Sequence, residues 1–302
     1  MAIFTNANLT ATIPQIWADI INEAKFPQFV LQNFVTDLSP YMTEGGRIVH
    51  VPNIFTNLFT ATTQATQGTD IIASAQAPAT VDTTLAVNTH QYVAWVIGDA
   101  DLAQLATKYQ LNEKYAMEAK RVLLQTLEDA LFGLYTSLTN SVGSAAAIAD
   151  LTIRQALTIM DTGNFEADMT AFFFHPVVFW NQLSGLSKFN PNYSSNFNLI
   201  ASGTLGVTGD NKSKRMGILY GREVYMSSRV ILATTYKNLL LHTAAFGFAV
   251  QDPTDNGSKV RIQMWEERRL LSFVGAVDIR YGVAVLRADA GVVILTDAST
   301  VA

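Results

Sequence analysis

Four histidines are the residues of this chain whose chemistry would be most informative. They are His50, His90, His175 and His242. Metal-binding histidines often lie four residues apart on one helix face, and these four are far apart in the sequence without such a partner. His50 and His90 fall in two strands that we expect to pair, where they could face each other, but two imidazoles alone make a poor metal site. We therefore expect ordinary histidines and no metal.

The segment 206–213 is the nearest approach to a phosphate-binding loop. Its sequence, GVTGDNKS, has Asn211 where the pattern requires glycine. The pattern also needs a helix directly afterwards, whereas residues 216–221 are typical of a strand and a turn. We expect a flexible loop and no nucleotide.

Two neighbouring carboxylates, Glu266 and Glu267, could suggest acid–base chemistry. Adjacent strand residues point to opposite faces, however, so these two groups would not act together. With Arg268 and Arg269 they are better interpreted as an ion-pair patch facing another subunit or as a solvated turn. No serine stands in a G-x-S-x-G motif. The sequence therefore predicts neither an enzyme nor a cofactor.

The composition indicates a protein with little charge and much apolar surface. Hydrophobic residues make up 49% and charged residues 15% of the 302 positions, against about 25% charged in typical domains. This favours contact with other chains, although a large, well-buried monomer is an alternative. The net charge of −5, with no basic run, argues against a protein whose main task is to grip nucleic acid.

Other features exclude further classes. The chain has no cysteine, which excludes disulfides and thiol catalysis. No uncharged apolar run approaches the ~20 residues that a membrane span requires. The first residues lack the basic region of a secretory signal. We expect a soluble protein that is made in the cytoplasm and has no contact with membranes.

The first half of the chain is organised as an arm, a hairpin and a helix. Residues 1–38 are apolar and interrupted by prolines, which favours short helical pieces that pack on another surface. Residues 47–52 and 81–97 are predicted to be the strands of one long excursion over 41–97, which needs something to lie against because a two-stranded ribbon is marginal alone. Apolar residues at helical spacing over 112–138 predict a helix of about 25 residues that packs on a sheet rather than in a coiled coil.

The second half is predicted to mix helices and strands. Residues 140–149 are expected to be a linker, followed by a helix at 152–161. A helix should begin at His175–Pro176, and 190–209 should be a polar loop. Strands are expected at 171–174, 260–265, 271–279, 283–286 and 291–295, a pair of strands around Tyr220–Gly221 within 218–225, and a strand or short helix within 239–250.

Several short phrases, in a fixed order, carry a resemblance to a known family. They are Gly45–Pro52, Phe174–Trp180, Gly217–Ser227, Leu241–Ala249 and Tyr281–Arg287. Their order, with the long helix between the hairpin and the second half, resembles the major capsid protein of tailed bacteriophages, which has the HK97-type fold. The resemblance covers nearly the whole chain.

The resemblance implies an α+β, HK97-like capsid fold with an N-terminal arm, an extended β-hairpin loop, a long spine helix, and peripheral and axial domains. The implied divisions are the arm at 1–38, the extended loop at 39–97, the peripheral domain with the spine helix at 98–144, the axial domain at 145–250 and the return strands of the peripheral domain at 251–302. The implied function is structural: a virion subunit that assembles in the host cytoplasm into hexamers and pentamers around double-stranded DNA, which it contacts non-specifically. Further copies of the chain and a portal are the implied partners.

The sequence departs from the family at two points. Crosslinking members join a lysine of the extended loop to a neighbour's asparagine, but no lysine lies between Lys25 and Lys108. We therefore expect stabilisation by noncovalent contacts or by a cement protein. No long charged coiled-coil segment precedes the arm, so a separate scaffolding protein is expected if the gene product begins at Met1.

The expected subunit contacts lie in the arm and the extended loop. They are Trp17, Phe26, Phe29, Arg47, Phe55, Phe59 and Asp70. Each could instead pack within its own subunit. An encapsulin-like compartment that encloses a cargo enzyme shares the fold and is the alternative function. A hydrolase with an unrecognised site and a surface-binding adhesin are weaker alternatives.

Overall fold

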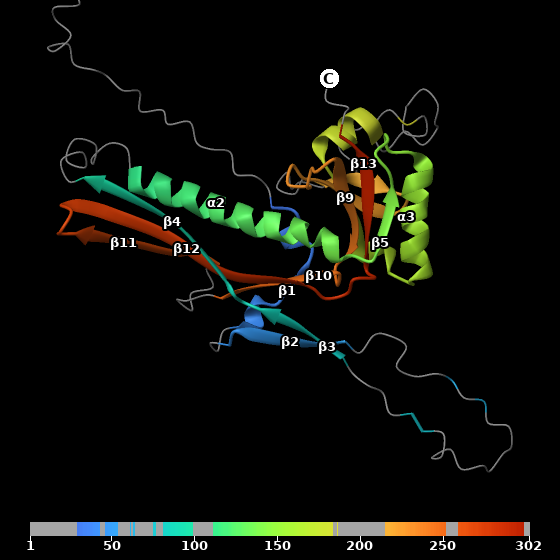
Figure 1. The fold of residues 1–302 in the computed structure, drawn as a ribbon, viewed down its shortest axis with the longest axis horizontal. Coiled ribbons are helices and arrows are strands. Elements are labelled where there is room, and N and C mark those ends of the chain that lie inside the picture. The colour runs from blue at the N-terminus through green and yellow to red at the C-terminus, as the bar shows by residue number, and fades with distance from the viewer. Residues whose placement is uncertain are drawn as a thin grey trace, which may run out of the picture.

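The computed structural model describes residues 29–42, 46–53, 81–98, 111–183, 186, 215–251 and 259–298, together with the isolated positions 61, 63, 75 and 76. Within these ranges the chain folds into a five-stranded sheet, a six-stranded sheet and a separate two-stranded hairpin (Figure 1). Each of the two larger sheets carries one long helix. Mixed helix and sheet confirm the predicted α+β class.

The five-stranded sheet is built around β12 (Ser272–Val285). On one edge, β12 pairs with β4 (Thr89–Gly98). On the other edge it pairs first with β11 (Arg261–Glu267) and then with β10 (Phe246–Gln251), which in turn pairs with the short β1 (Thr36–Asp37). Because opposite residues of an antiparallel pair share a face, these registers determine which side chains lie together.

The helix α2 (Leu111–Gly133) packs on one face of this sheet, and a 3₁₀ turn (Leu134–Ser137) continues it. The predicted helix over 112–138 is thus confirmed. Its buried residues at helical spacing are Ala116, Ala119, Leu123, Leu127 and Leu131. Trp95 of β4 lies across Gly275, where a Cβ would meet the indole at 2.3 Å, and its ring contacts Tyr115 of α2 edge-on at 6.2 Å. The α2 side of the sheet is therefore closely packed.

A hairpin of β2 (Ile48–Asn53) and β3 (Val81–Ala86) rests with its root on the opposite face of the same sheet. Leu85 and Val87 are buried there in a cluster with Ala249 of β10. The approach is close, because a Cβ on Gly282 would meet the carbonyl oxygen of Ala86 at 2.2 Å. The predicted pairing of 47–52 with the start of 81–97 is confirmed.

The six-stranded sheet has the order β5 (Asn140–Gly143), β13 (Gly291–Asp297), β9 (Thr235–His242), β6 (Thr170–Phe174), β8 (Arg222–Met226) and β7 (Arg215–Leu219). The helix α3 (Asp150–Thr162), which confirms the helix predicted at 152–161, packs on it. Asn238, fully buried in β9, joins three strands: its Oδ1 accepts the backbone N–H of His175, and its Nδ2 donates to Oγ1 of Thr296 at 2.9 Å.

Several predicted boundaries are wrong. The predicted strand over 81–97 divides near Val87 into β3 and β4, which belong to different sheets. The two strands expected at 271–279 and 283–286 are one strand, β12, because β4 pairs with its residues 272–281 and β10 with 280–285, so the pairing continues without a break. The expected linker at 140–149 contains β5, whose backbone pairs with β13. A strand or short helix was expected within 239–250, and the structure has the end of β9 and most of β10.

Sheet membership also divides the chain differently from the expected boundary between 250 and 251. β10 lies before that boundary but belongs to the five-stranded sheet, whereas β13 lies after it and returns to the six-stranded sheet. The chain therefore crosses between the two sheets more often than a division at 250 implies.

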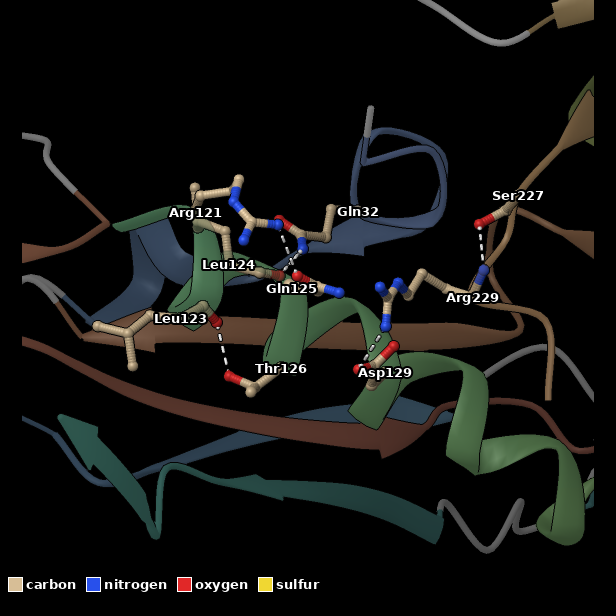
Figure 2. Close-up of polar contacts among 9 residues, drawn as sticks. All are labelled: Gln32, Arg121, Leu123, Leu124, Gln125, Thr126, Asp129, Ser227 and Arg229. Atoms are coloured by element: carbon tan, nitrogen blue, oxygen red, sulfur yellow. Dashed lines mark hydrogen bonds and ion pairs between the residues drawn. The ribbon is translucent and has the colours of Figure 1, made fainter. Parts of the chain in front are cut away.

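The segment before β1 is anchored on α2 by one buried carboxylate. Glu128 is fully buried, and its two oxygens accept the backbone N–H groups of Val30, Leu31 and Gln32 at 2.9, 2.7 and 3.1 Å. Figure 2 shows the neighbouring contact, in which the Gln32 side chain donates to the carbonyl oxygen of Leu124. Burial raises the pKa of Glu128 although these three backbone donors act to lower it.

A second link in the same region joins the far end of α2 to the six-stranded sheet. Arg229, in the segment after β8, lies 3.4 Å from Asp129 of α2 (Figure 2). Both side chains are partly exposed, so this ion pair contributes little to stability and chiefly restricts geometry.

Candidate functional site: an open sheet face and a basic pocket

The histidines do not come together in the structure. His50 lies 2.6 Å from Asp82 within the hairpin, and His90 lies 3.0 Å from Asp278 in the five-stranded sheet, so the two do not face each other as the predicted pairing allowed. Burial lowers the pKa of both His175 and His242. In the part of the chain that the structure describes, no three His, Cys, Asp or Glu residues are grouped as metal ligands. Nor does any helix there have the length and apolar character to span a bilayer.

The outer half of the five-stranded sheet exposes several large apolar side chains on one face. Its members alternate with the residues beneath α2: Tyr92 and Val96 on β4, and Trp265 on β11, are 70%, 57% and 43% exposed. The register places Val96 and Trp265 on either side of Val274 in one row across three strands. We call the three exposed residues Tyr92, Val96 and Trp265 the open face; Val274, in the middle of the row, is buried, with 8% of its surface exposed.

The turn between β11 and β12 extends this apolar surface at the far end of the sheet. Leu270 and Leu271 are 65% and 71% exposed. Leu271 has a φ of 44°, a left-handed conformation that is unfavourable for a side chain with a Cβ. Large apolar side chains exposed together are typical of surfaces that other molecules cover. The chain thus exposes two leucines here, one of them, Leu271, at a position where glycine or asparagine would fit the backbone better.

A polar pocket of about 410 Å³ lies at the other end of the same face, beside the hairpin root. The register aligns Gln251, Arg280 and His90 in one row across β10, β12 and β4. Arg47 joins them from the start of the hairpin, where its carbonyl oxygen accepts the N–H of Val87 at 2.8 Å. We call Arg47, His90, Gln251 and Arg280 the root pocket.

The charge balance of the root pocket is positive. Asp278, two residues before Arg280 on β12, accepts two hydrogen bonds from Arg261, at 2.8 and 2.9 Å, and also pairs with His90. Burial would raise the pKa of Asp278, but these hydrogen bonds outweigh it and the pKa is lowered. Asp278 is thus already neutralised by Arg261. Arg47 and Arg280 form no ion pair with any described residue.

The structure places only part of the predicted contact set. Phe29 is half-buried near the anchored segment, and Arg47 is exposed and lines the root pocket. Trp17, Phe26, Phe55, Phe59 and Asp70 lie outside the described residues, as does the near-miss phosphate loop at 206–213. Sequence reasoning missed Tyr92, Val96, Trp265 and Arg280. One signal could have found the first two: positions 92, 94 and 96 are apolar as well as 93, 95 and 97, which predicts a strand covered on both faces.

No protein-family model and no curated protein sequence matches the chain. Many solved structures match its fold. A chain of Mycobacterium phage Che8 is 19% identical, with a TM-score of 0.72, and the alignment covers 94% of this chain and 97% of that one. A chain of the mature capsid of bacteriophage PhiM1 is 12% identical, with a TM-score of 0.68 and coverages of 96% and 93%. The holo-SrpI encapsulin complex of Synechococcus elongatus also matches, at 12% identity, with a TM-score of 0.62 and coverages of 99% and 98%.

These comparisons define the fold. The structural neighbours are largely phage major capsid proteins of the HK97 type, and they align over nearly the whole chain. The chain therefore has the HK97-type capsid fold that the resemblance implied. Because an encapsulin shares that fold, the fold alone does not distinguish a virus shell from a protein compartment.

Proposed function

We propose that this chain is the shell-forming subunit of a tailed-phage capsid, with no enzymatic activity. Copies of it assemble in the host cytoplasm into hexamers and pentamers that close around double-stranded DNA. Residues 1–38 act as the arm, 39–97 as the extended loop, and the remainder as peripheral and axial domains. The shell works with a portal and a separate scaffolding protein. It has no isopeptide crosslink from the extended loop and is stabilised by noncovalent contacts or a cement protein.

The observation that carries this proposal is the full-length match to capsid proteins together with the open face. A subunit that assembles must leave apolar area exposed until its neighbours bury it. Burial of apolar surface yields about 25 cal/mol per Å², so the exposed side chains of the open face represent free energy that only association can recover. The contact residues predicted in the arm and loop, from Trp17 to Asp70, belong to the same proposal.

The encapsulin-like compartment is the second candidate, favoured by the match to the SrpI encapsulin. The two functions differ in content. A phage shell encloses nucleic acid and a compartment encloses a cargo protein. The absorbance ratio at 260 and 280 nm of purified particles, followed by gel analysis of their contents, separates them.

Paired substitutions test the role of the open face in assembly. Val96→Lys places a charge on the open face, and Leu151→Lys is the matched control, because Leu151 is equally exposed at 56% but lies on α3, away from this sheet. We expect Val96→Lys to abolish particles in sedimentation velocity while the subunit still folds, and Leu151→Lys to assemble like the wild type. Normal assembly of Val96→Lys would contradict the role of the open face.

A further inference from the structure

The root pocket has the construction of an anion site. It brings two guanidinium groups and an imidazole from three separate segments around a cavity of about 410 Å³. The backbone holds them in place: His90 and Arg280 are opposite one another in the β4–β12 pair, and Arg47 is fixed beside the β3–β4 junction by the 2.8 Å bond to Val87. Their arrangement therefore does not depend on flexible loops.

Within the residues that the structure describes, its two guanidinium groups have no carboxylate partner. Asp278 is committed to Arg261 through a bidentate pair and is only 8% exposed in its side chain. Arg47 and Arg280 are exposed and have no ion-pair partner in the described part of the chain. Two like charges beside one cavity repel each other, so an anion placed between them would relieve that repulsion and gain two charge-assisted hydrogen bonds.

We propose that the root pocket binds a carboxylate side chain from a second copy of this chain. This inference rests on the proposed assembly function and names one of its contacts. The chain has 25 acidic and 20 basic residues, so copies meeting one another supply carboxylates in excess. The pocket also adjoins the open face along the same side of the sheet, so a copy that covers Tyr92 brings its own side chains to the root pocket. A guanidinium pair recognises a carboxylate by two parallel hydrogen bonds, which fixes the register of the two copies as well as attracting them.

The pocket fits a single side chain better than a nucleic acid backbone. Duplex DNA presents a continuous row of phosphates and is bound by extended basic surfaces. Here the two arginines flank one cavity. Arg261, on the same face, is bound to Asp278, and the apolar Tyr92 and Val96 follow along β4. The test must therefore distinguish a carboxylate of a second copy from a phosphate of packaged DNA as the group bound in the pocket.

The direct test is zero-length crosslinking of assembled particles. Arg280→Lys keeps the positive charge and supplies an amine that a carbodiimide couples only to a carboxylate within ion-pair distance. Particles are assembled from a mixture of ¹⁴N- and ¹⁵N-labelled subunits, and crosslinked peptides are identified by mass spectrometry. We expect a peptide joining position 280 to an acidic residue, with mixed-isotope pairs that prove a link between chains. Particles that form but yield no mixed-isotope link at position 280 would overturn the inference.

Charge removal gives a second readout. Arg47→Gln and Arg280→Gln should leave unfolding of the free subunit unchanged, because both side chains are exposed and neither forms an ion pair with a residue that the structure describes. Each should raise the subunit concentration needed for half-maximal assembly about tenfold, since a charge pair desolvated at an interface contributes much more than an exposed one. The control Lys120→Gln, an exposed cation on α2 outside the pocket, should have no such effect.

The outcomes separate this inference from the function on which it rests. If the wild-type chain forms no particles, the proposed function fails. If wild-type particles form and both glutamine variants assemble at the same concentration, only the root pocket inference fails. If the variants assemble normally but the particles contain less DNA, the pocket binds phosphate and the carboxylate assignment is wrong.

Discussion

The buried Glu128 offers the sharpest prediction about stability. Glu128→Ala removes the acceptor for three backbone N–H groups, those of Val30, Leu31 and Gln32. An unsatisfied buried donor costs about 1–3 kcal/mol, and the side chain also leaves a cavity. Adding the cost of three unsatisfied donors to the cost of the cavity gives an upper range. Because the freed segment can partly reach water, we expect a loss near its lower end, about 3–5 kcal/mol in the free energy of unfolding.

Glu128→Gln separates the effect of losing hydrogen bonds from the effect of losing side-chain volume, because glutamine has nearly the same size as glutamate. The amide keeps one carbonyl oxygen, which can still accept from Val30 and Leu31, but its NH₂ then faces the N–H of Gln32. We expect a smaller loss of about 1–2 kcal/mol. The control is Glu118→Gln on the same helix, whose carboxylate is exposed and paired with Arg121, for which about 0.5 kcal/mol or less is expected.

Denaturant unfolding of the isolated subunit, followed by circular dichroism, measures these differences. The pH dependence of the free energy of unfolding tests whether the pKa of Glu128 is raised, because a raised and a lowered pKa predict opposite trends with pH. Since burial raises the pKa of Glu128 in the folded protein, its contribution to stability is complete below the unfolded pKa and is lost as pH rises through the folded pKa. Glu128→Gln should remove that decline. A loss below about 0.5 kcal/mol for Glu128→Ala would refute the anchoring role, because such values are typical of surface positions.

Three further predictions follow from the packing. Gly282→Ala places a Cβ against the carbonyl of Ala86, so we expect a loss of about 1–3 kcal/mol in chemical unfolding; an unchanged midpoint would mean that the hairpin root is not packed as described. Asn238→Ala removes the side chain that joins β9 to His175 and β13 and should lower the free energy of unfolding by about 2–4 kcal/mol, whereas a neutral effect would contradict that role. The pKa of Asp278 is lowered in the folded protein, so this carboxylate stabilises the fold above its unfolded pKa, and the stabilisation is lost as pH falls through its folded pKa. Asp278→Asn should remove that part of the acid destabilisation. If the variant and the wild type lose stability identically in acid, the role of Asp278 is contradicted.

The elements with strong local periodicity could be predicted from the sequence, and those fixed by tertiary pairing could not. The helix α2 has an apolar stripe that is readable without context, and Tyr220–Gly221 gives the turn between β7 and β8 a local signal. The division between β3 and β4 has no such signal, because one period-two run continues across it from Leu85 to Ile97 and only the different partners of the two strands separate them. The same reasoning explains β12, whose length depends on neighbours along both edges.

The candidate site was also predictable only in part, because strand pairing brings together residues that are far apart in the sequence. Arg47 was found because it borders the hairpin, whereas Arg280 lies 233 positions later in the sequence and reaches the same pocket through strand register. The open face could have been inferred from β4, where apolar residues occupy both faces of one strand. Which face α2 covers is a property of the assembled sheet and is not encoded in the strand itself.

Electron microscopy of the purified protein, with absorbance at 260 and 280 nm on the same fraction, tests the central claim most directly. We predict closed icosahedral particles or capsomer rings, with encapsidated nucleic acid in particles from infected cells. A protein that stays monomeric at high concentration, including in the presence of candidate scaffolding proteins, would contradict the shell function.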